Sequence, residues 1–72
     1  MEENRWKYLH DSIECKYDYE EEDFIKWLDE KGSQGWELVS YTKTERLDYR
    51  NETEYVYSAV FKRPYIVEKI IL

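Results

Sequence analysis

The stretch Gly35-Trp36-Glu37-Leu38-Val39-Ser40 carries most of the information about the fold of this 72-residue chain. Gly35 can leave a helix in the left-handed conformation that residues with a side chain avoid. Trp36 and Leu38 stand two residues apart, so both point to one side of the strand that is expected to follow. The stretch therefore predicts the end of a helix and the beginning of a strand.

The residues before this stretch predict the only helix of the chain, over 18–31. Asp18 is its expected N-cap, with capping-box spacing to Glu21, and the acids at 20–23 suit the positive end of the helix dipole. Gly32 is expected to close the helix. The expected apolar stripe consists of Phe24, Ile25 and Leu28, with Trp27 off its centre.

Three strands are predicted around this helix, over about 5–15, 36–44 and 53–62, because aromatic and β-branched residues recur there. The polar segment 45–52, with Asn51 as a turn residue, predicts a hairpin between the second and third strands. Pro64 is expected to stop the last strand. In the first strand one face is expected to carry Trp6, Tyr8 and His10, and the other Lys7, Leu9, Asp11, Ile13 and Cys15.

This order of elements predicts an α+β fold of β-α-β-β type. A helix crossover makes the first two strands parallel, and a hairpin makes the last two antiparallel. Placing the third strand in the centre lets it pair antiparallel with both, so the predicted strand order is 1-3-2. We expect a single domain over 1–64, because a chain this short cannot divide its core, followed by an apolar tail over 65–72.

The predicted third strand is largely apolar on both faces. One face is expected to hold Tyr55, Tyr57, Ala59 and Phe61, and the other Val56, Ser58 and Val60. In the second strand Val39 and Tyr41 are expected opposite Trp36 and Leu38. One helix covers only one face of a sheet, so the tail 65–72 or a second copy of the chain is expected to cover the other. A homo-oligomer is therefore predicted, in which the tail packs on its own domain or on a partner subunit.

The charge of the chain bounds its partners. Seventeen acids against eleven bases give a net charge of −6 and a sequence pI near 4.7. Such a surface repels polyphosphate and anionic lipid, so neither nucleic acid nor a membrane is an expected partner. The sequence has no apolar run of about 18 residues and no signal peptide. The single cysteine fits a reducing compartment, so a cytoplasmic location is expected.

The sequence offers little for catalysis. His10 and Cys15 are its only histidine and cysteine, and their strand parity points them to opposite faces. No catalytic residue, metal site or cofactor is therefore predicted, and the chain is expected not to be an enzyme. The acidic run 18–23 has the carboxylates for a cation or a basic protein partner, but a solvated helix N-terminus explains it equally well.

The only basic grouping of the sequence is Lys62-Arg63 with Lys69, Arg46 and Arg50, and an ordinary charged strand end is one interpretation of it. Arginine pairs with phosphate, and aromatic rings stack on bases. The alternative interpretation is a cleft between subunits that binds a small anionic, ring-bearing ligand. The candidate ligand-binding residues are Arg63, Lys62, Tyr55, Tyr57 and Trp36.

Three motifs, taken together, resemble a family of small bacterial and phage domains of unknown function. They are Trp6-Lys7-Tyr8, Gly35-Trp36-Glu37-Leu38-Val39-Ser40 and Val60-Phe61-Lys62-Arg63-Pro64. The resemblance covers most of 5–64 and implies a compact β-α-β-β unit, with no catalytic residues to carry over. This chain departs from the family pattern in its more acidic helix start and its longer apolar tail.

Together these features predict a non-enzymatic binding or interaction module that self-associates. One alternative is a phage-type sequestering protein that holds a nucleotide-like ligand between subunits. Another is an acidic inhibitor that binds a basic protein through Glu20, Glu21 and Glu22.

Overall fold

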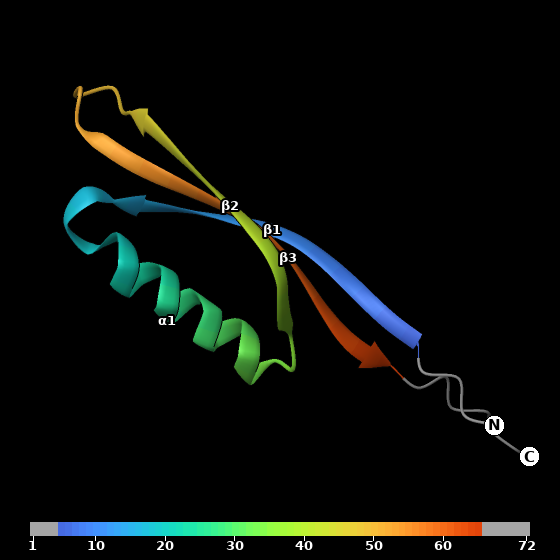
Figure 1. Cartoon of the computed structure of the whole chain (residues 1–72). Coiled ribbons are helices and arrows are strands. Elements are labelled where there is room, and N and C mark those ends of the chain that lie inside the picture. The colour runs from blue at the N-terminus through green and yellow to red at the C-terminus, as the bar shows by residue number, and fades with distance from the viewer. Residues whose placement is uncertain (1–4, 66–72) are drawn as a thin grey trace, which may run out of the picture.

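The computed structural model describes residues 5–65 of the chain. Its elements, in chain order, are β1 (Arg5–Lys16), the 3₁₀ turn η1 (Tyr17–Tyr19), α1 (Glu20–Ser33), β2 (Glu37–Leu47) and β3 (Thr53–Tyr65) (Figure 1). The three strands form one sheet in the order β1-β3-β2, and β3 pairs antiparallel with both neighbours. The predicted α+β fold, element order and strand order are confirmed.

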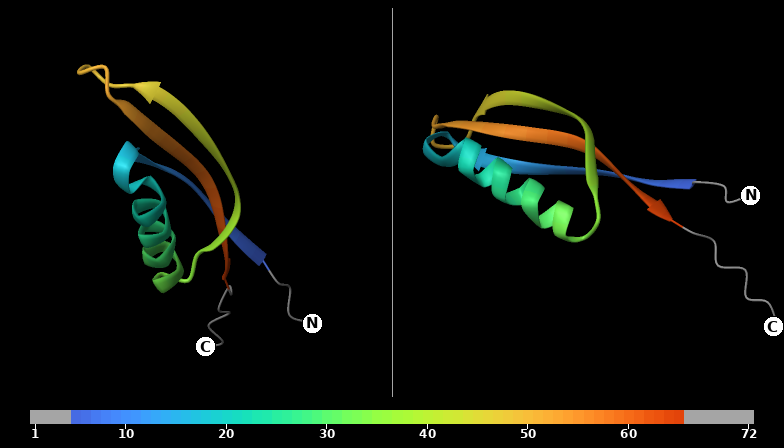
Figure 2. Two further views of the ribbon diagram at one scale, coloured as in Figure 1. Left: turned by 60° about the vertical axis from the view of Figure 1, so that its left-hand side comes forward. Right: turned by 60° about the horizontal axis from the view of Figure 1, so that its bottom comes forward.

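The helix lies against one face of the sheet only (Figure 2). We call the other side the open face. The strand register assigns it Trp6, Tyr8, His10, Ser12, Glu14 and Lys16 of β1, Glu54, Val56, Ser58, Val60, Lys62 and Pro64 of β3, and Glu37, Ser40, Thr42, Thr44 and Arg46 of β2. This side is therefore less apolar than expected, because the outer strands place Glu14 and Thr44 beside Val56, and His10 and Ser40 beside Val60.

The helix begins two residues later than predicted. Asp18 lies in η1, and Tyr19 is the N-cap of α1, with no hydrogen bond from its side chain. The predicted Asp18 cap is therefore wrong. The four acids at 20–23 do occupy the first turn, where the helix dipole favours negative charge.

The helix also ends later than predicted, because Gly32 lies inside it. Gly35 has a φ of +86°, and its N–H donates to the Gly32 carbonyl at 2.9 Å. The Trp36 N–H reaches back to the Lys31 carbonyl at 3.0 Å. These two bonds form a Schellman motif, in which the left-handed residue after the C-cap is usually glycine. Gly35, the first residue of the fold-deciding stretch, thus ends the helix.

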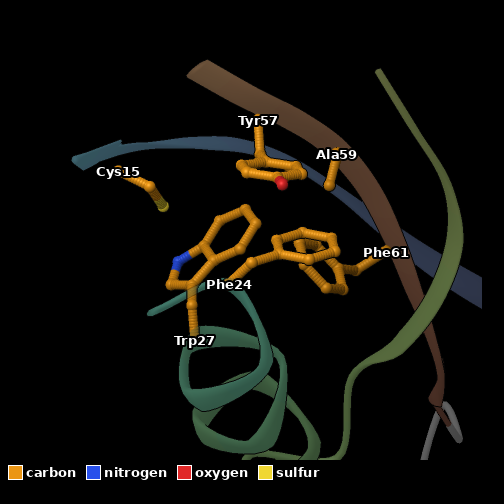
Figure 3. Close-up of a cluster of buried hydrophobic side chains, with 6 residues drawn as sticks. All are labelled: Cys15, Phe24, Trp27, Tyr57, Ala59 and Phe61. Carbon is orange, nitrogen blue, oxygen red and sulfur yellow. The ribbon is translucent and has the colours of Figure 1, made fainter. Parts of the chain in front are cut away.

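The core lies between α1 and the sheet (Figure 3). Its buried apolar residues are Cys15, Phe24, Trp27, Tyr57, Ala59 and Phe61. The Phe24 ring stacks on Tyr57 with 4.0 Å between centroids. Trp27 meets the edge of Phe61 and is 8% exposed, whereas Ile25 is 54% exposed. The predicted stripe is therefore wrong at Ile25, and Trp27 widens the buried face: the inward face passes through Phe24, Trp27 and Leu28, at helical spacing.

A β-bulge in β2 changes which side its residues face. The pairing with β3 shifts between Leu38 and Ser40. The extra residue reverses the alternation, so Leu38 and Tyr41 share the helix side. The Tyr41 ring lies 4.9 Å from that of Phe24. The expectation that Tyr41 lies opposite Leu38 is corrected by this bulge.

The strands are longer than predicted, and the hairpin tip is shorter. The tip spans the residues between β2 and β3, and Asn51 there has a φ of +60°, as expected for a turn residue. Oδ1 of Asp48 accepts bonds from the backbone N–H groups of Arg50 and Glu52. Pro64 lies inside β3, opposite Trp6, so it does not stop the strand at 62. Of the predicted tail 65–72, Tyr65 belongs to β3 and the rest lies outside the described residues.

Candidate functional site

The first residues of β1 and the last of β3 form a two-stranded ribbon. Residues 5–8 pair with 62–65, and β2 joins the sheet only at Glu37, opposite Lys62. The ribbon therefore runs beyond β2 and beyond the end of α1 (Figures 1 and 2). We call residues 5–8 and 62–65 the basic ribbon.

The basic ribbon has a charge opposite to that of the chain as a whole. It contains four cationic residues and no acid, in a chain with a net charge of −6. These cations are Arg5, Lys7, Lys62 and Arg63. An isolated positive region on an acidic chain attracts anions locally, while the rest of the surface repels them.

Arg63 and Trp36 form one cation–aromatic pair, on the helix side of the ribbon. The Arg63 guanidinium carbon lies 4.3 Å from the centroid of the Trp36 ring. Its Nη1 also donates to the Gln34 carbonyl at 3.0 Å, just beyond α1. The stacking and the hydrogen bond fix the guanidinium in one orientation. Two of the predicted ligand-binding residues are therefore neighbours.

Lys62 lies on the opposite side of the ribbon. Its Nζ is 4.3 Å from the centroid of the Trp6 ring. Tyr8 pairs with Lys62 across the strands and is 66% exposed. Adjacent strand residues point to opposite faces, so Lys62 and Arg63 cannot bind the same small group from one chain.

The two predicted tyrosines lie at the far end of the sheet. Tyr57 is 4% exposed and belongs to the core, where its hydroxyl donates to Glu20 at 3.1 Å. Tyr55 is half-buried beside Lys43, whose Nζ lies 4.3 Å from its ring centroid. The five candidate residues therefore occupy three separate places in a single chain, and ligand binding by them stays a prediction.

Burial of Tyr57 has an electrostatic consequence. Removal of its hydroxyl from water raises the pKa of Tyr57, and the hydrogen bond to Glu20 adds to this shift. The same Glu20 carboxylate lies 2.7 Å from Nζ of Lys43, and that hydrogen bond raises the pKa of Lys43. The Tyr57 hydroxyl is therefore committed to holding the start of α1 and is protonated at neutral pH.

A chain of ion pairs crosses the hairpin end of the sheet. Glu54 is buried and accepts from Nε of Arg46 at 2.5 Å, and Lys16 lies 3.6 Å from its other oxygen. Arg46 also reaches Glu14 at 2.7 Å, and Lys16 reaches Asp48 at 3.2 Å. The hydrogen bond that Arg46 donates to Glu54 is the main cause that raises the pKa of Arg46. These charged side chains at this end of the sheet are therefore paired with one another within the chain.

An open hollow of about 600 Å³ lies beside this network. Its lining is mixed in charge and consists of Lys16, Asp18, Tyr19, Glu52 and Thr53. Within residues 5–65, no group of three or more histidine, cysteine, aspartate or glutamate side chains is arranged to hold a metal ion. The described part of the chain also contains no helix long and apolar enough to cross a membrane.

Comparison with known proteins places the chain in a family. The model of a domain of unknown function, DUF4177, matches residues 6–64. The chain belongs to the DUF4177 family. The predicted membership of a small family of unknown function is thus confirmed. No curated protein and no solved structure matches this DUF4177 chain.

One polar contact of this DUF4177 domain was not predicted from sequence. Nε2 of His10 lies 2.7 Å from Oγ of Ser58, on the open face. The two residues are 48 positions apart, so only the register between β1 and β3 brings them together. The alternation of side chains along each strand shows which residues lie on one face of that strand, but it does not show that His10 and Ser58 are neighbours.

The cysteine of the DUF4177 domain lies on the other side of the sheet. Cys15 is 1% exposed, and burial raises the pKa of its thiol, with the Asp23 and Glu20 charges adding to the effect. A buried thiol with a raised pKa is a poor nucleophile. His10 is exposed on the open face, so the predicted separation of His10 from Cys15 is confirmed.

Proposed function

We propose that this chain is a non-enzymatic binding module that self-associates through its open face. The observation that carries the proposal is the charge of that face. Its charged residues are Glu14, Lys16, Glu37, Arg46, Glu54 and Lys62, three of each sign, so the face has no net charge. The whole net charge of −6 is carried by the rest of the chain.

Charge neutrality matters because two identical copies repel each other wherever they bring like charge together. On an acidic chain, a neutral surface is where a second copy can approach without this repulsion. The ion pairs of the face are already formed within one chain, between Glu54 and Arg46 and between Glu14 and Arg46. Docking a second copy therefore buries these three charged side chains with their partners already in place.

The side chains of the open face also suit contact between sheets. Ser12, Ser58 and Thr42 lie side by side across the three strands at its middle, and such small groups allow two sheets to pack about 10 Å apart. The large rings, Trp6 and Tyr8, lie at one end and are 42% and 66% exposed. A twofold axis through the middle places these rings over the far end of the other copy and buries them.

The size of the face predicts a weak dimer. The twelve residues of β1 span about 40 Å, and three strands are about 14 Å wide. This footprint is smaller than the roughly 800 Å² per partner of a standard stable interface. We therefore expect reversible association that depends on protein concentration.

The single buried Cys15 supports a cytoplasmic location for the module, since it forms no disulfide within the described chain.

The experiment compares Ser12→Arg with Ser33→Arg by sedimentation equilibrium. Ser12 is exposed at the middle of the open face, and Ser33 is exposed at the end of α1. The two variants make the same substitution with the same change in charge. We expect the wild type and Ser33→Arg to reach dimer mass as concentration rises, and Ser12→Arg to stay near 9.0 kDa.

Two outcomes overturn the proposal. If the wild-type chain stays monomeric at millimolar concentration, it does not self-associate and the proposal is wrong. A Ser12→Arg variant that dimerises as the wild type does shows that the interface lies elsewhere. Circular dichroism of each variant confirms that the substitutions leave the fold intact.

A further inference from the structure

We propose that the helix side of the basic ribbon binds the phosphate group of a mononucleotide. The inference rests on the proposed role as a binding module and names the ligand of that module. It uses residues on the opposite side of the sheet from the open face. Self-association and ligand binding are therefore separable by substitution.

The first support is the way in which the cations of the chain are partnered. Lys16, Lys31, Lys43 and Arg46 each lie within 4 Å of a carboxylate. Within residues 5–65, Lys7, Lys26, Arg50, Lys62 and Arg63 form no ion pair with a carboxylate, but only Lys7, Lys62 and Arg63 are gathered in the basic ribbon, each near an aromatic ring. In a chain with seventeen acids, cations left without acidic partners indicate a site for an external anion.

The second support is the position of two like charges. Lys7 and Arg63 are direct partners across β1 and β3, on the same side of the ribbon. Like charges at such a pair destabilise a sheet when nothing neutralises them. A phosphate between the two side chains removes this repulsion and accepts hydrogen bonds from both. Binding is therefore expected to stabilise the ribbon.

The third support is the fixed orientation of Arg63. Its guanidinium stacks on Trp36 and uses one N–H on the Gln34 carbonyl. An arginine carries five N–H donors, and two of them can donate parallel hydrogen bonds to one phosphate. A guanidinium group that is already fixed in orientation loses less entropy when it forms these bonds. Lys7 supplies the second charge, as a flexible ammonium group.

The aromatic rings beside the phosphate site favour a nucleotide over free phosphate. Tyr65 is 38% exposed on the helix side of the ribbon, with Nζ of Lys7 6.0 Å from its centroid. Trp36 is half-buried beneath Arg63. A base stacked on an exposed ring strengthens binding, whichever base the nucleotide carries.

The charge of the remaining surface favours a mononucleotide over a polymer. Acids occupy the first turn of α1 at 20–23, and the basic ribbon is only four residues long on each strand. A polyanion long enough to extend from the ribbon along α1 meets this acidic turn at the far end of the helix and is repelled. A single phosphate group stays within the positive region.

The experiment is a titration followed by amide chemical shifts in nuclear magnetic resonance. The probes are adenosine 5′-monophosphate, adenosine, inorganic phosphate and a short oligothymidylate. We expect the monophosphate to shift the amides of Lys7, Arg63 and Trp36, and to bind about tenfold more tightly than inorganic phosphate. Equal binding of adenosine and the monophosphate, or tighter binding of the oligothymidylate, overturns the proposal.

The test variants are Arg63→Gln and Lys7→Gln, and the matched control is Arg50→Gln. Arg50 also lies over an aromatic ring, with its guanidinium carbon 5.3 Å from the centroid of Tyr49, but at the hairpin tip. We expect the monophosphate to bind about tenfold more weakly to each test variant and unchanged to the control. Equal losses in Arg63→Gln and Arg50→Gln contradict a specific site.

The same titration on Ser12→Arg separates the two proposals. Unchanged binding of the monophosphate to this variant supports a site within one chain, whether or not the wild type dimerises. Loss of binding in Ser12→Arg alone shows that the site needs two copies, and overturns the site described here. Absence of shifts in both proteins overturns the ligand and leaves self-association to be judged by sedimentation.

Discussion

Nζ of Lys31 lies 2.7 Å from Oδ2 of Asp11, so one ion pair joins the last part of α1 to the middle of β1. At the other end of the helix, Glu20 lies 2.7 Å from Lys43 of β2. The two pairs tie the inward face of α1 to the two outer strands of the sheet. They fix the direction in which the helix crosses it.

The Lys31–Asp11 pair predicts a pH dependence of stability. The hydrogen bond from Lys31 lowers the pKa of Asp11 below its usual 3.8. A carboxyl whose pKa is lower in the folded state stabilises that state above its unfolded pKa, and loses this effect as pH falls through the folded pKa. The pair is partly exposed, so we expect Asp11→Asn to cost at most about 1 kcal/mol at pH 7.

Urea denaturation of both proteins at pH 7 and near pH 2 checks this prediction. The difference in free energy of unfolding between wild type and Asp11→Asn is expected to shrink at the lower pH. An equal difference at both values means that the substitution acts by some route other than the charge of Asp11.

The packing of the core predicts that two nearby helix residues, Trp27 and Ile25, contribute very differently to stability. Trp27 is buried against Phe61, whereas Ile25 is mostly exposed. We expect Trp27→Ala to cost about 3–5 kcal/mol, because it empties a large core site, and Ile25→Ala to cost less than about 0.5 kcal/mol. Thermal unfolding followed by circular dichroism measures both. Similar losses in the two variants contradict the assignment of the inward face.

The two glycines predict changes of opposite sign. Gly35 has a φ of +86°, where a side chain is strained, and we expect Gly35→Ala to cost about 1–2 kcal/mol. Gly32 lies inside α1, and a methyl group there meets no atom within 4 Å. Gly32→Ala is expected to stabilise the chain by up to about 1 kcal/mol. Chemical denaturation that gives both variants the same sign contradicts the helix end described above.

Among the ion-paired residues at the hairpin end of the sheet, we expect the buried one to contribute most to stability. The Glu54 side chain is 8% exposed and joins Arg46 to Lys16, whereas Glu14 is 64% exposed and contacts Arg46 alone. We expect Glu54→Gln to cost about 1–3 kcal/mol, because its partners lose a charge-assisted bond in a buried setting. Glu14→Gln is expected to be nearly neutral. Urea midpoints in which Glu14→Gln is the weaker variant refute this order.

Much of the fold follows from local patterns. Alternation in the first strand places Leu9, Ile13 and Cys15 on one face, and the structure shows that all three contribute to the core beneath the helix. Helix crossover and hairpin together make β3 antiparallel to both other strands, which allows the central position that it occupies. The side of Tyr41 could not be predicted, because a bulge depends on pairing with another strand and leaves no mark in the alternation itself.

The candidate site was predicted only in part, for a similar reason. Arg63 and Trp36 are neighbours, as a shared site requires, but they are 27 positions apart and meet through the sheet register. Tyr57 lies in the core because the helix covers its part of β3. Sequence composition identifies aromatic and basic residues, but not which of them the helix covers.

The most direct test of self-association through the open face is an isotope-filtered nuclear Overhauser measurement on a mixture of labelled and unlabelled chains. We predict contacts between the ring protons of Tyr8 in one copy and open-face methyl groups, such as those of Val56, in the other. Contacts that join the rings of one copy only to α1 of the other, or no contacts between copies at all, would contradict it.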